Sequence, residues 1–297
     1  MGISRTTCQY KAKPKDDQEV QDALTVLTTK HAAIGYWQCC YRLWNKGYSW
    51  NHKKIYRVYT DMKLNIRRRA KKRLLGRIKQ PLTVPTGPNM VWSIDFMSDS
   101  LMDSRKFRMF KVMDDFNRKS LAVEVDTSLP SLRVIRVSER IIENRTKPNI
   151  IRSDNGPEFI SHQLQQWCKD KNVELQYIQP GKPTQNAFIE RKNGSIRGEL
   201  LNAYLFNNLS EVRELTQEWR IDYNEERPHK SLGYLSPLKY AEKVAARTGI
   251  GNTLKIAESR SSCNKCEIWW KTLNSSGTKI RGDYNWIGVW VYRASVE

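Results

Sequence analysis

Three carboxylates in the middle of this 297-residue sequence occupy positions suited to chemistry. Asp95 lies within the apolar run 91–96, where a charged side chain is costly unless it binds something. Asp154 follows a short apolar run, and the Asn-Gly-Pro turn behind it leaves its carboxylate at a strand end, where α/β sheets bind ligands. Glu190 shares one face of an expected helix with Asn186, Asn193 and Arg197, at spacings of four, three and four.

Carboxylate oxygens without histidine or cysteine partners suit Mg²⁺ or Mn²⁺ better than zinc. Two such ions about 4 Å apart can activate an attacking oxygen and stabilise a leaving one, with no covalent protein intermediate. The three residues therefore predict phosphoryl transfer. Each also has an ordinary interpretation: Asp95 as an edge-strand surface residue, Asp154 as a turn former and Glu190 as an exposed helix residue. Glu158 is the substitute ligand, and surface or turn roles are expected for Asp99, Asp103, Asp114 and Asp115.

The elements that must position these residues alternate between strands and helices. Apolar residues in strand-like patterns predict strands over 91–97, 107–113 and 121–125. An amphipathic pattern then predicts a helix over 132–142, and a short apolar run predicts a strand over 149–153. A helix over 158–171, a strand over 173–178 and a long helix from Thr184 to about Leu205 follow. This order indicates an α/β domain with a mixed sheet. Gly194 and Gly198 are expected to fray or bend the last helix, since each interior glycine costs about 1 kcal/mol.

A basic helical region precedes this domain. Helical spacing over 33–45, a break at Gly47, a cap at Asn51 and a second helix over 52–62 predict a helix-turn-helix-like unit. Its basic residues Lys53, Lys54 and Arg57, with the run Arg67, Arg68 and Arg69, suit phosphate contacts. An ordinary helical hairpin with a solvated basic face is the alternative. The tryptophan and tyrosine side chains around this helical pair are expected mostly in the core.

The charge of the chain points to a polyanionic partner. Lysine and arginine number 51 against 31 acidic residues, for a formal net charge of +20, and residues 1–94 alone hold 19 basic and 5 acidic residues. No run of about 18 apolar residues and no apolar signal core is present, which favours a cytoplasmic, nucleoid-associated protein. The six cysteines form no framework and are expected to be reduced; Cys263 and Cys266 have only half of a zinc spacing.

Four phrases around these residues are more specific than the carboxylates alone. They are Trp92-Ser-Ile-Asp-Phe96, Asp154-Asn-Gly-Pro-Glu-Phe159, Gln179-Pro-Gly-Lys-Pro-Thr-Gln-Asn-Ala-Phe-Ile-Glu-Arg191 and Tyr223-Asn-Glu-Glu-Arg-Pro-His229. In this order, with thirty-five residues between Asp154 and Glu190, they resemble the integrase-type second-frame (OrfB) insertion-sequence transposases and the DDE triad of retroviral integrases. The resemblance covers about residues 32–242. His229 belongs to it but is expected to be structural.

The resemblance implies an RNase H-like core that nicks DNA at the ends of its element and joins the freed 3′-hydroxyl to a second DNA site. In its terms Asp95, Asp154 and Glu190 hold two Mg²⁺ or Mn²⁺ ions, and the DNA backbone lies near Lys182, Arg191, Lys192 and Arg197. It also implies double-stranded DNA as partner, an upstream-frame (OrfA) protein and an oligomer on DNA. No membrane partner is expected.

The expected organisation is an N-terminal segment (1–30), the helix-turn-helix-like region with its basic run (31–80), a linker (81–90), the catalytic core (91–244) and a C-terminal extension of unknown role (245–297). Two rival functions stay open beside transposition. A catalytically silent remnant would only occupy the ends of its element, and a structure-selective nuclease would cut nucleic acid without joining strands.

Overall fold

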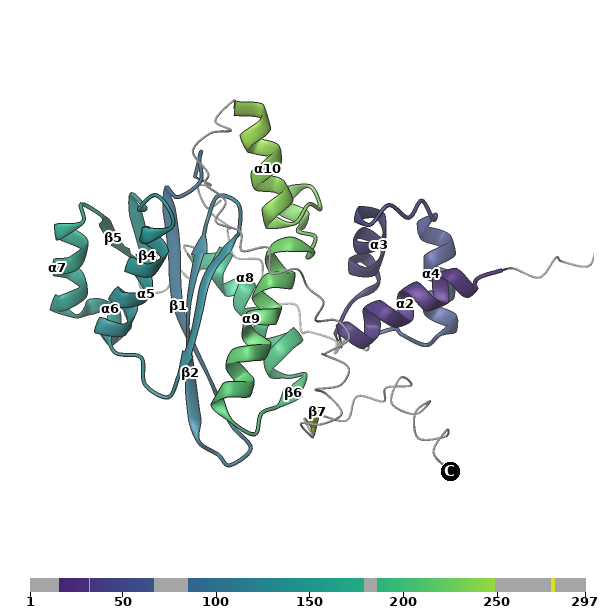
Figure 1. Cartoon of the computed structure of the whole chain (residues 1–297), viewed down its shortest axis with the longest axis horizontal. Coiled ribbons are helices and arrows are strands. Elements are labelled where there is room, and N and C mark those ends of the chain that lie inside the picture. The colour runs from purple at the N-terminus through teal and green to yellow at the C-terminus, as the bar shows by residue number, and fades with distance from the viewer. Residues whose placement is uncertain (1–15, 32, 67–84, 179–185, 249–278, 281–297) are drawn as a thin grey trace, which may run out of the picture. The chain divides into compact units, whose positions relative to one another are not determined.

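The computed structural model describes residues 16–31, 33–66, 85–178, 186–248 and 279–280 (Figure 1). The described residues divide into two units, the first within residues 16–66 and the second within residues 85–280, and each is described by itself. Four of the residues expected to bind DNA (Arg67, Arg68, Arg69 and Lys182) and the pair Cys263 and Cys266 lie outside the described residues. No helix in the described ranges is long and apolar enough to cross a membrane.

The first unit is built on three helices, α2 (Gln18–Lys30), α3 (Tyr36–Asn45) and α4 (His52–Asp61). The predicted helical pair is confirmed as α3 and α4. Gly47 takes a φ of +97° between them, and the Asn51 side chain accepts a hydrogen bond from the Lys53 N–H at 2.9 Å. Helix α2 was not predicted; its Val20 and Leu24 pack into the same core as Cys39 and Ile55.

The second unit contains a five-stranded mixed sheet, which confirms the predicted fold class. Its strands are β1 (Val91–Ser100), β2 (Lys106–Asp114), β3 (Ser120–Asp126), β4 (Ile150–Ser153) and β5 (Glu174–Tyr177). Their order is β3-β2-β1-β4-β5, antiparallel from β3 to β1 and parallel from β1 to β5. Strand β1 therefore lies at the centre and pairs with both halves of the sheet.

Helices cover both faces of this sheet (Figure 1). On one face α5 (Ser131–Glu143), α6 (Pro157–Ile160) and α7 (His162–Asp170) form a core with Trp92, Phe110 and Val112 of the strands. On the other, α8 (Ala187–Ile196), its π-helical continuation η2 (Arg197–Leu201) and α9 (Leu209–Glu225) pack on Phe107 and Met109. The single helix predicted over 158–171 is divided, because Ser161 leaves helical geometry and caps α7.

Shorter elements complete the unit: β6 (Tyr204–Leu205), the 3₁₀ turn η3 (Lys230–Leu232), α10 (Pro237–Thr248) and β7 (Lys279–Ile280). In the expected C-terminal extension, β7 pairs antiparallel with β6, with Tyr204 opposite Ile280. This ladder ties one point of the extension to the segment that follows the π-helical turn.

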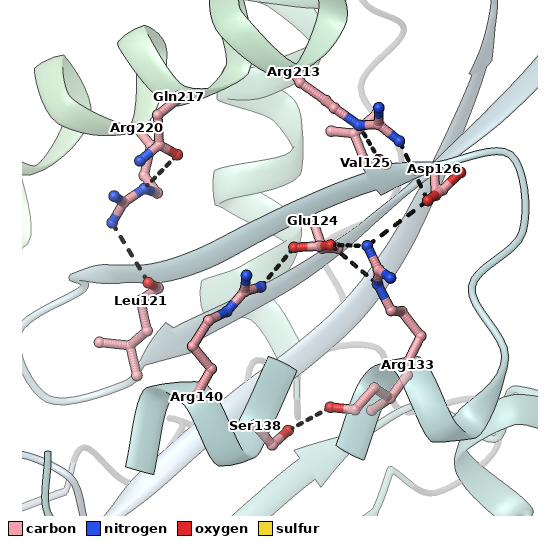
Figure 2. A network of polar contacts seen from close by, with 11 residues as sticks. Leu121, Glu124, Val125, Asp126, Arg133, Ser138, Arg140, Arg213, Gln217 and Arg220 are labelled. Carbon is pink, nitrogen blue, oxygen red and sulfur yellow. Dashed lines mark hydrogen bonds and ion pairs between the residues drawn. The ribbon is translucent and has the colours of Figure 1, made fainter. Parts of the chain in front are cut away.

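An arginine network fastens helices from both faces to the edge strand β3 (Figure 2). Glu124 accepts hydrogen bonds from Arg133 (2.6 Å) and Arg140 (2.7 Å) of α5. From α9, Arg213 lies 3.3 Å from Asp126 and donates to the Val125 carbonyl. Charged side chains along an exposed edge also disfavour strand-to-strand aggregation.

The surface roles expected for two aspartates are wrong. Asp114 and Asp115 are fully buried, because partners distant in sequence satisfy them. Asp115 accepts from the Ser93 hydroxyl at 2.6 Å and pairs with Arg152 at 3.0 Å, while Asp114 accepts from backbone N–H groups of Asn89 and Phe116. Asp103 does lie in an exposed turn, paired with Arg105, but Asp99 belongs to β1 rather than to a turn.

Candidate active site

Asp95 lies near the middle of β1, on the face that α8 covers. Its Oδ1 accepts the N–H of Phe96 at 2.8 Å. Its Oδ2 accepts the amide N–H of Asn193 from α8 and lies 3.5 Å from the Nζ of Lys111, the residue directly opposite on β2. Both carboxylate oxygens are thus engaged, and only 14 % of the side chain is exposed.

Asp154 is brought level with Asp95 by the parallel pairing of β1 and β4. Ser93 is paired with Arg152, and each aspartate lies two residues further along its strand direction. The Gly156 N–H donates to Asp154 Oδ1 at 3.1 Å, and a Cβ on Gly156 would lie only 3.1 Å from that oxygen. Burial raises the pKa of Asp154, and the negative charges of Asp95 and Glu158 raise it further.

Glu190 lies in the first turn of α8, and its pKa is also raised, first by burial and then by the charge of Asp95. The helix is held on the sheet by buried contacts: the Arg118 guanidinium stacks 3.2 Å from the Phe188 ring centroid, and Lys192 Nζ lies 3.4 Å from the Val112 carbonyl oxygen. The Asn193 amide adds the bond to Asp95. The charge of Asp95 therefore reaches both of the other predicted carboxylates, Asp154 and Glu190.

The donor set fits a divalent cation in its chemistry, since three carboxylates supply hard oxygen ligands and a cation would relieve the repulsion that raises the pKa of Asp154 and Glu190. Among the described residues, however, no three Asp, Glu, His or Cys side chains lie close enough to hold one ion together. Lys111 and Asn193 engage Asp95 instead. Glu158, the expected substitute ligand, is paired with Arg108 across the Phe96 ring.

Comparisons with known proteins show the family of the chain. Two models, each described as an integrase core domain, match residues 85–183 and 171–237. An uncharacterized 31.7 kDa protein of insertion element IS407 from Burkholderia multivorans is 41 % identical over 83 % of this chain and 89 % of its own length. The chain belongs to the integrase-core family of insertion-element transposases.

Two further relatives are also proteins of insertion elements. The IS476 39.2 kDa protein of Xanthomonas euvesicatoria is 37 % identical over 81 % of this chain and 70 % of its own length, and the putative IS150 transposase of Escherichia coli is 24 % identical over 82 % and 91 %. Among solved structures, the magnesium-bound catalytic core of human T-cell leukemia virus 2 integrase aligns with 52 % of this chain and 97 % of its own, at 20 % identity and a TM-score of 0.42.

The basic residues of this transposase do not all lie where a DNA backbone could reach them. Lys192 is only 1 % exposed, so the expectation that it contacts DNA is withdrawn. Arg197 donates to the Ser98 carbonyl at 3.1 Å and remains nearly half exposed, and Arg191 is exposed beside Glu190. In the helical unit Lys53 is exposed, whereas Arg57 donates two bonds to Asp17, at 2.6 and 2.8 Å. Lys54 lies 3.9 Å from the same carboxylate.

The aromatic residues of the helical unit match the expected core position only in part: Tyr59 is buried and Tyr36, Trp44 and Trp50 pack against the core, but others are exposed. Trp37 and Tyr56 are more than half exposed, and both rings contact that of Tyr36, with centroids 5.0 and 5.1 Å away. They form an exposed aromatic surface rather than part of the core, because the inward positions of α3 and α4 are taken by Cys39, Cys40 and Ile55.

Sequence reasoning missed Lys111 at the site. A lysine within the apolar run 107–113 is the signal that could have revealed it, since alternation places it on the same side of the sheet as its cross-strand neighbour Asp95. Burial lowers the pKa of Lys111 to about 8, against the opposing effect of Asp95.

Proposed function

We propose that this transposase cuts and joins DNA phosphodiester bonds, with Asp95, Asp154 and Glu190 as ligands of Mg²⁺ or Mn²⁺, two ions in the reacting state. The observation that supports the proposal is the position of Asp95 on the central strand, with Asp154 level with it after β4 and Glu190 on α8, each close enough to Asp95 for that charge to raise its pKa. When bound, such ions would activate the attacking oxygen and stabilise the leaving one.

The chain's own residues hold this arrangement. The Gly156 N–H orients the Asp154 carboxylate. Arg118 on Phe188 seats the first turn of α8 and with it Glu190. Arg191, exposed next to Glu190, offers a guanidinium to a phosphate of the DNA strand being cut. The reaction needs no nucleophile from the protein, because water or a DNA 3′-hydroxyl attacks.

Double-stranded DNA is the proposed partner, at the element ends and at the target. The exposed Lys53 supplies sequence-independent contacts, and the basic run Arg67–Arg69 and Lys182 add positive charge to the sequence for the same purpose. Binding should therefore weaken steeply with salt, by about 0.9 in log affinity per log unit of salt for each phosphate neutralised. An upstream-frame partner and an oligomer on DNA belong to this proposal by family resemblance. A cytoplasmic, nucleoid-associated location follows from it.

The test is a plasmid that carries the DNA flanking the gene, incubated with Mg²⁺ or Mn²⁺ and the full chain, with new 3′ ends mapped by primer extension. Asp154→Asn should abolish nicking and leave DNA affinity nearly unchanged. Asp103→Asn, which removes an exposed carboxylate in a turn, is the matched control and should nick normally. Normal nicking by Asp154→Asn would refute the assignment of the site.

A second candidate, the catalytically silent remnant, is favoured by one observation: Asp95 is engaged by Lys111 and Asn193 rather than open toward Asp154. A silent remnant would bind the element ends without nicking them, even after the upstream-frame partner is added. A structure-selective nuclease would instead produce ends with no requirement for a 3′-hydroxyl donor.

A further inference from the structure

Lys111 is a lysine with no exposed side-chain surface, located directly beneath the active site. It lies between Phe110 and Val112 on β2, opposite Asp95 in the antiparallel register. A buried ammonium group is costly unless it is paired and hydrogen-bonded. Here its Nζ donates to the Asn193 side-chain oxygen and lies 3.5 Å from Asp95 Oδ2.

Asn193 connects the two charged groups. Its amide nitrogen donates to Asp95 and its amide oxygen accepts from Lys111, so the three side chains close a triangle between β1, β2 and α8. The other charged groups that act on Lys111 are Asp154, which attracts it, and Arg197 and Lys192, which repel it. The Lys111 ammonium therefore already places a positive charge 3.5 Å from Asp95 before any metal ion binds.

We propose that Lys111 is a built-in counter-ion of Asp95 that a divalent metal ion must displace, and that it thereby sets the metal affinity of the site. This inference rests on the proposed function, because it assumes that Asp95 is a metal ligand. Lys111 is a positioning residue: it acts through Asp95 and touches neither DNA nor the reacting atoms. With Asp95 engaged by an ion, the bond to the Asn193 oxygen would leave the Lys111 ammonium with a partner.

The consequence is a site that binds its first ion weakly. An ammonium and a divalent cation that share one carboxylate repel each other strongly, since the interior screens charge less than water does. Removing the lysine charge should tighten metal binding on the order of tenfold or more.

The experiment measures Mn²⁺ binding to the full chain without DNA, by the electron paramagnetic resonance signal of free Mn²⁺. Lys111→Met removes the charge and keeps an unbranched apolar side chain. Lys111→Gln also removes the charge but keeps a donor for Asp95 or Asn193. Lys192→Met is the matched control, because Lys192 is equally buried but its ammonium contacts the Val112 carbonyl rather than Asp95. Far-UV circular dichroism checks the fold of each variant.

We expect both Lys111 variants to bind Mn²⁺ about tenfold tighter than the parent, and Lys192→Met to change the dissociation constant less than threefold. Unchanged or weaker binding in folded Lys111→Met and Lys111→Gln overturns the proposal. An equal gain in Lys192→Met overturns it too, since the effect would then come from net charge rather than from contact with Asp95.

Asp154→Asn separates this failure from failure of the proposed function. If parental Mn²⁺ binding disappears in Asp154→Asn while the Lys111 variants bind no tighter, the metal site stands and the counter-ion role falls. If neither the parent nor the Lys111 variants show Asp154-dependent Mn²⁺ binding, the metal-dependent function and the inference fall together.

Discussion

Acid should unfold the sheet-containing unit partly through His229. Its Nε2 is out of contact with water and has no hydrogen-bond partner among the described residues, and its ring lies 4.8 Å from that of Tyr223. Burial lowers the pKa of His229 from 6.5 to about 3, with further lowering by the charges of Arg227 and Arg118. The folded chain therefore keeps this imidazole neutral over a pH range where the unfolded chain protonates it.

The sign and size of the effect follow from linkage. Between about pH 6.5 and pH 3 the unfolded state binds one proton more than the folded state, so stability falls as the pH falls. At pH 5, about 1.5 units below the unfolded pKa, the loss amounts to about 2 kcal/mol, since one unit corresponds to about 1.4 kcal/mol.

The assay is urea unfolding at pH 7 and pH 5, followed by tryptophan fluorescence, for the parent and for His229→Phe. The parent should lose about 2 kcal/mol more than the variant between the two pH values. His162→Phe, which replaces an exposed histidine at the start of α7, is the matched control and should lose as much as the parent. Equal acid losses in His229→Phe and the parent would refute the reasoning.

Two further predictions concern the helices. Phe188→Ala removes the ring under Arg118 and should destabilise the second unit by about 2 kcal/mol or more, with a larger fall in nicking than in DNA affinity. Denaturant unfolding measures the stability and plasmid nicking measures the activity. An unchanged unfolding midpoint would show that Phe188 does not hold α8 in place. Asp17→Asn frees Arg57 and Lys54 for phosphate, so affinity for DNA should rise and the log–log salt slope steepen by about 1 to 2 in fluorescence anisotropy. Weaker binding would show that the Asp17 contacts shape the DNA surface instead.

The mixed sheet and the level of its carboxylates could be predicted because they depend on local patterns. Alternating apolar runs, turn residues and the order of elements predict that Asp95 lies on a strand and that Asp154 directly follows one, and the parallel pairing of these strands brings the two level. The burial of Asp114 and Asp115 could not be predicted, since it depends on Arg152 and on backbone groups that approach only in the fold. Lys111 was missed for the same reason: a central strand covered on both faces buries both sets of alternating side chains.

The helix that carries Glu190 is followed by a change of helical pitch near two glycines, Gly194 and Gly198. A Cβ at Gly194 or Gly198 would meet open space, so packing does not require either glycine. Each nevertheless lowers helix preference by about 1 kcal/mol relative to alanine. The α-helix remains regular to Ile196 and then widens into the π-helical turn Arg197–Leu201, which contains Gly198.

The π-helical turn separates two differently packed parts of this helix. Ile189, Lys192 and Ile196 face the sheet at spacings of three and four, so Glu190 lies beside this buried stripe and stays exposed. It is still close enough to Asp95 for that charge to raise its pKa. Beyond them, both Leu200 and Leu201 are buried, an arrangement that the wider turn accommodates. It also leaves Arg197 donating to the Ser98 carbonyl at the far end of β1. Because the change of pitch comes after Ile196, the two ends of the helix meet different parts of β1 without moving Glu190 from the active site.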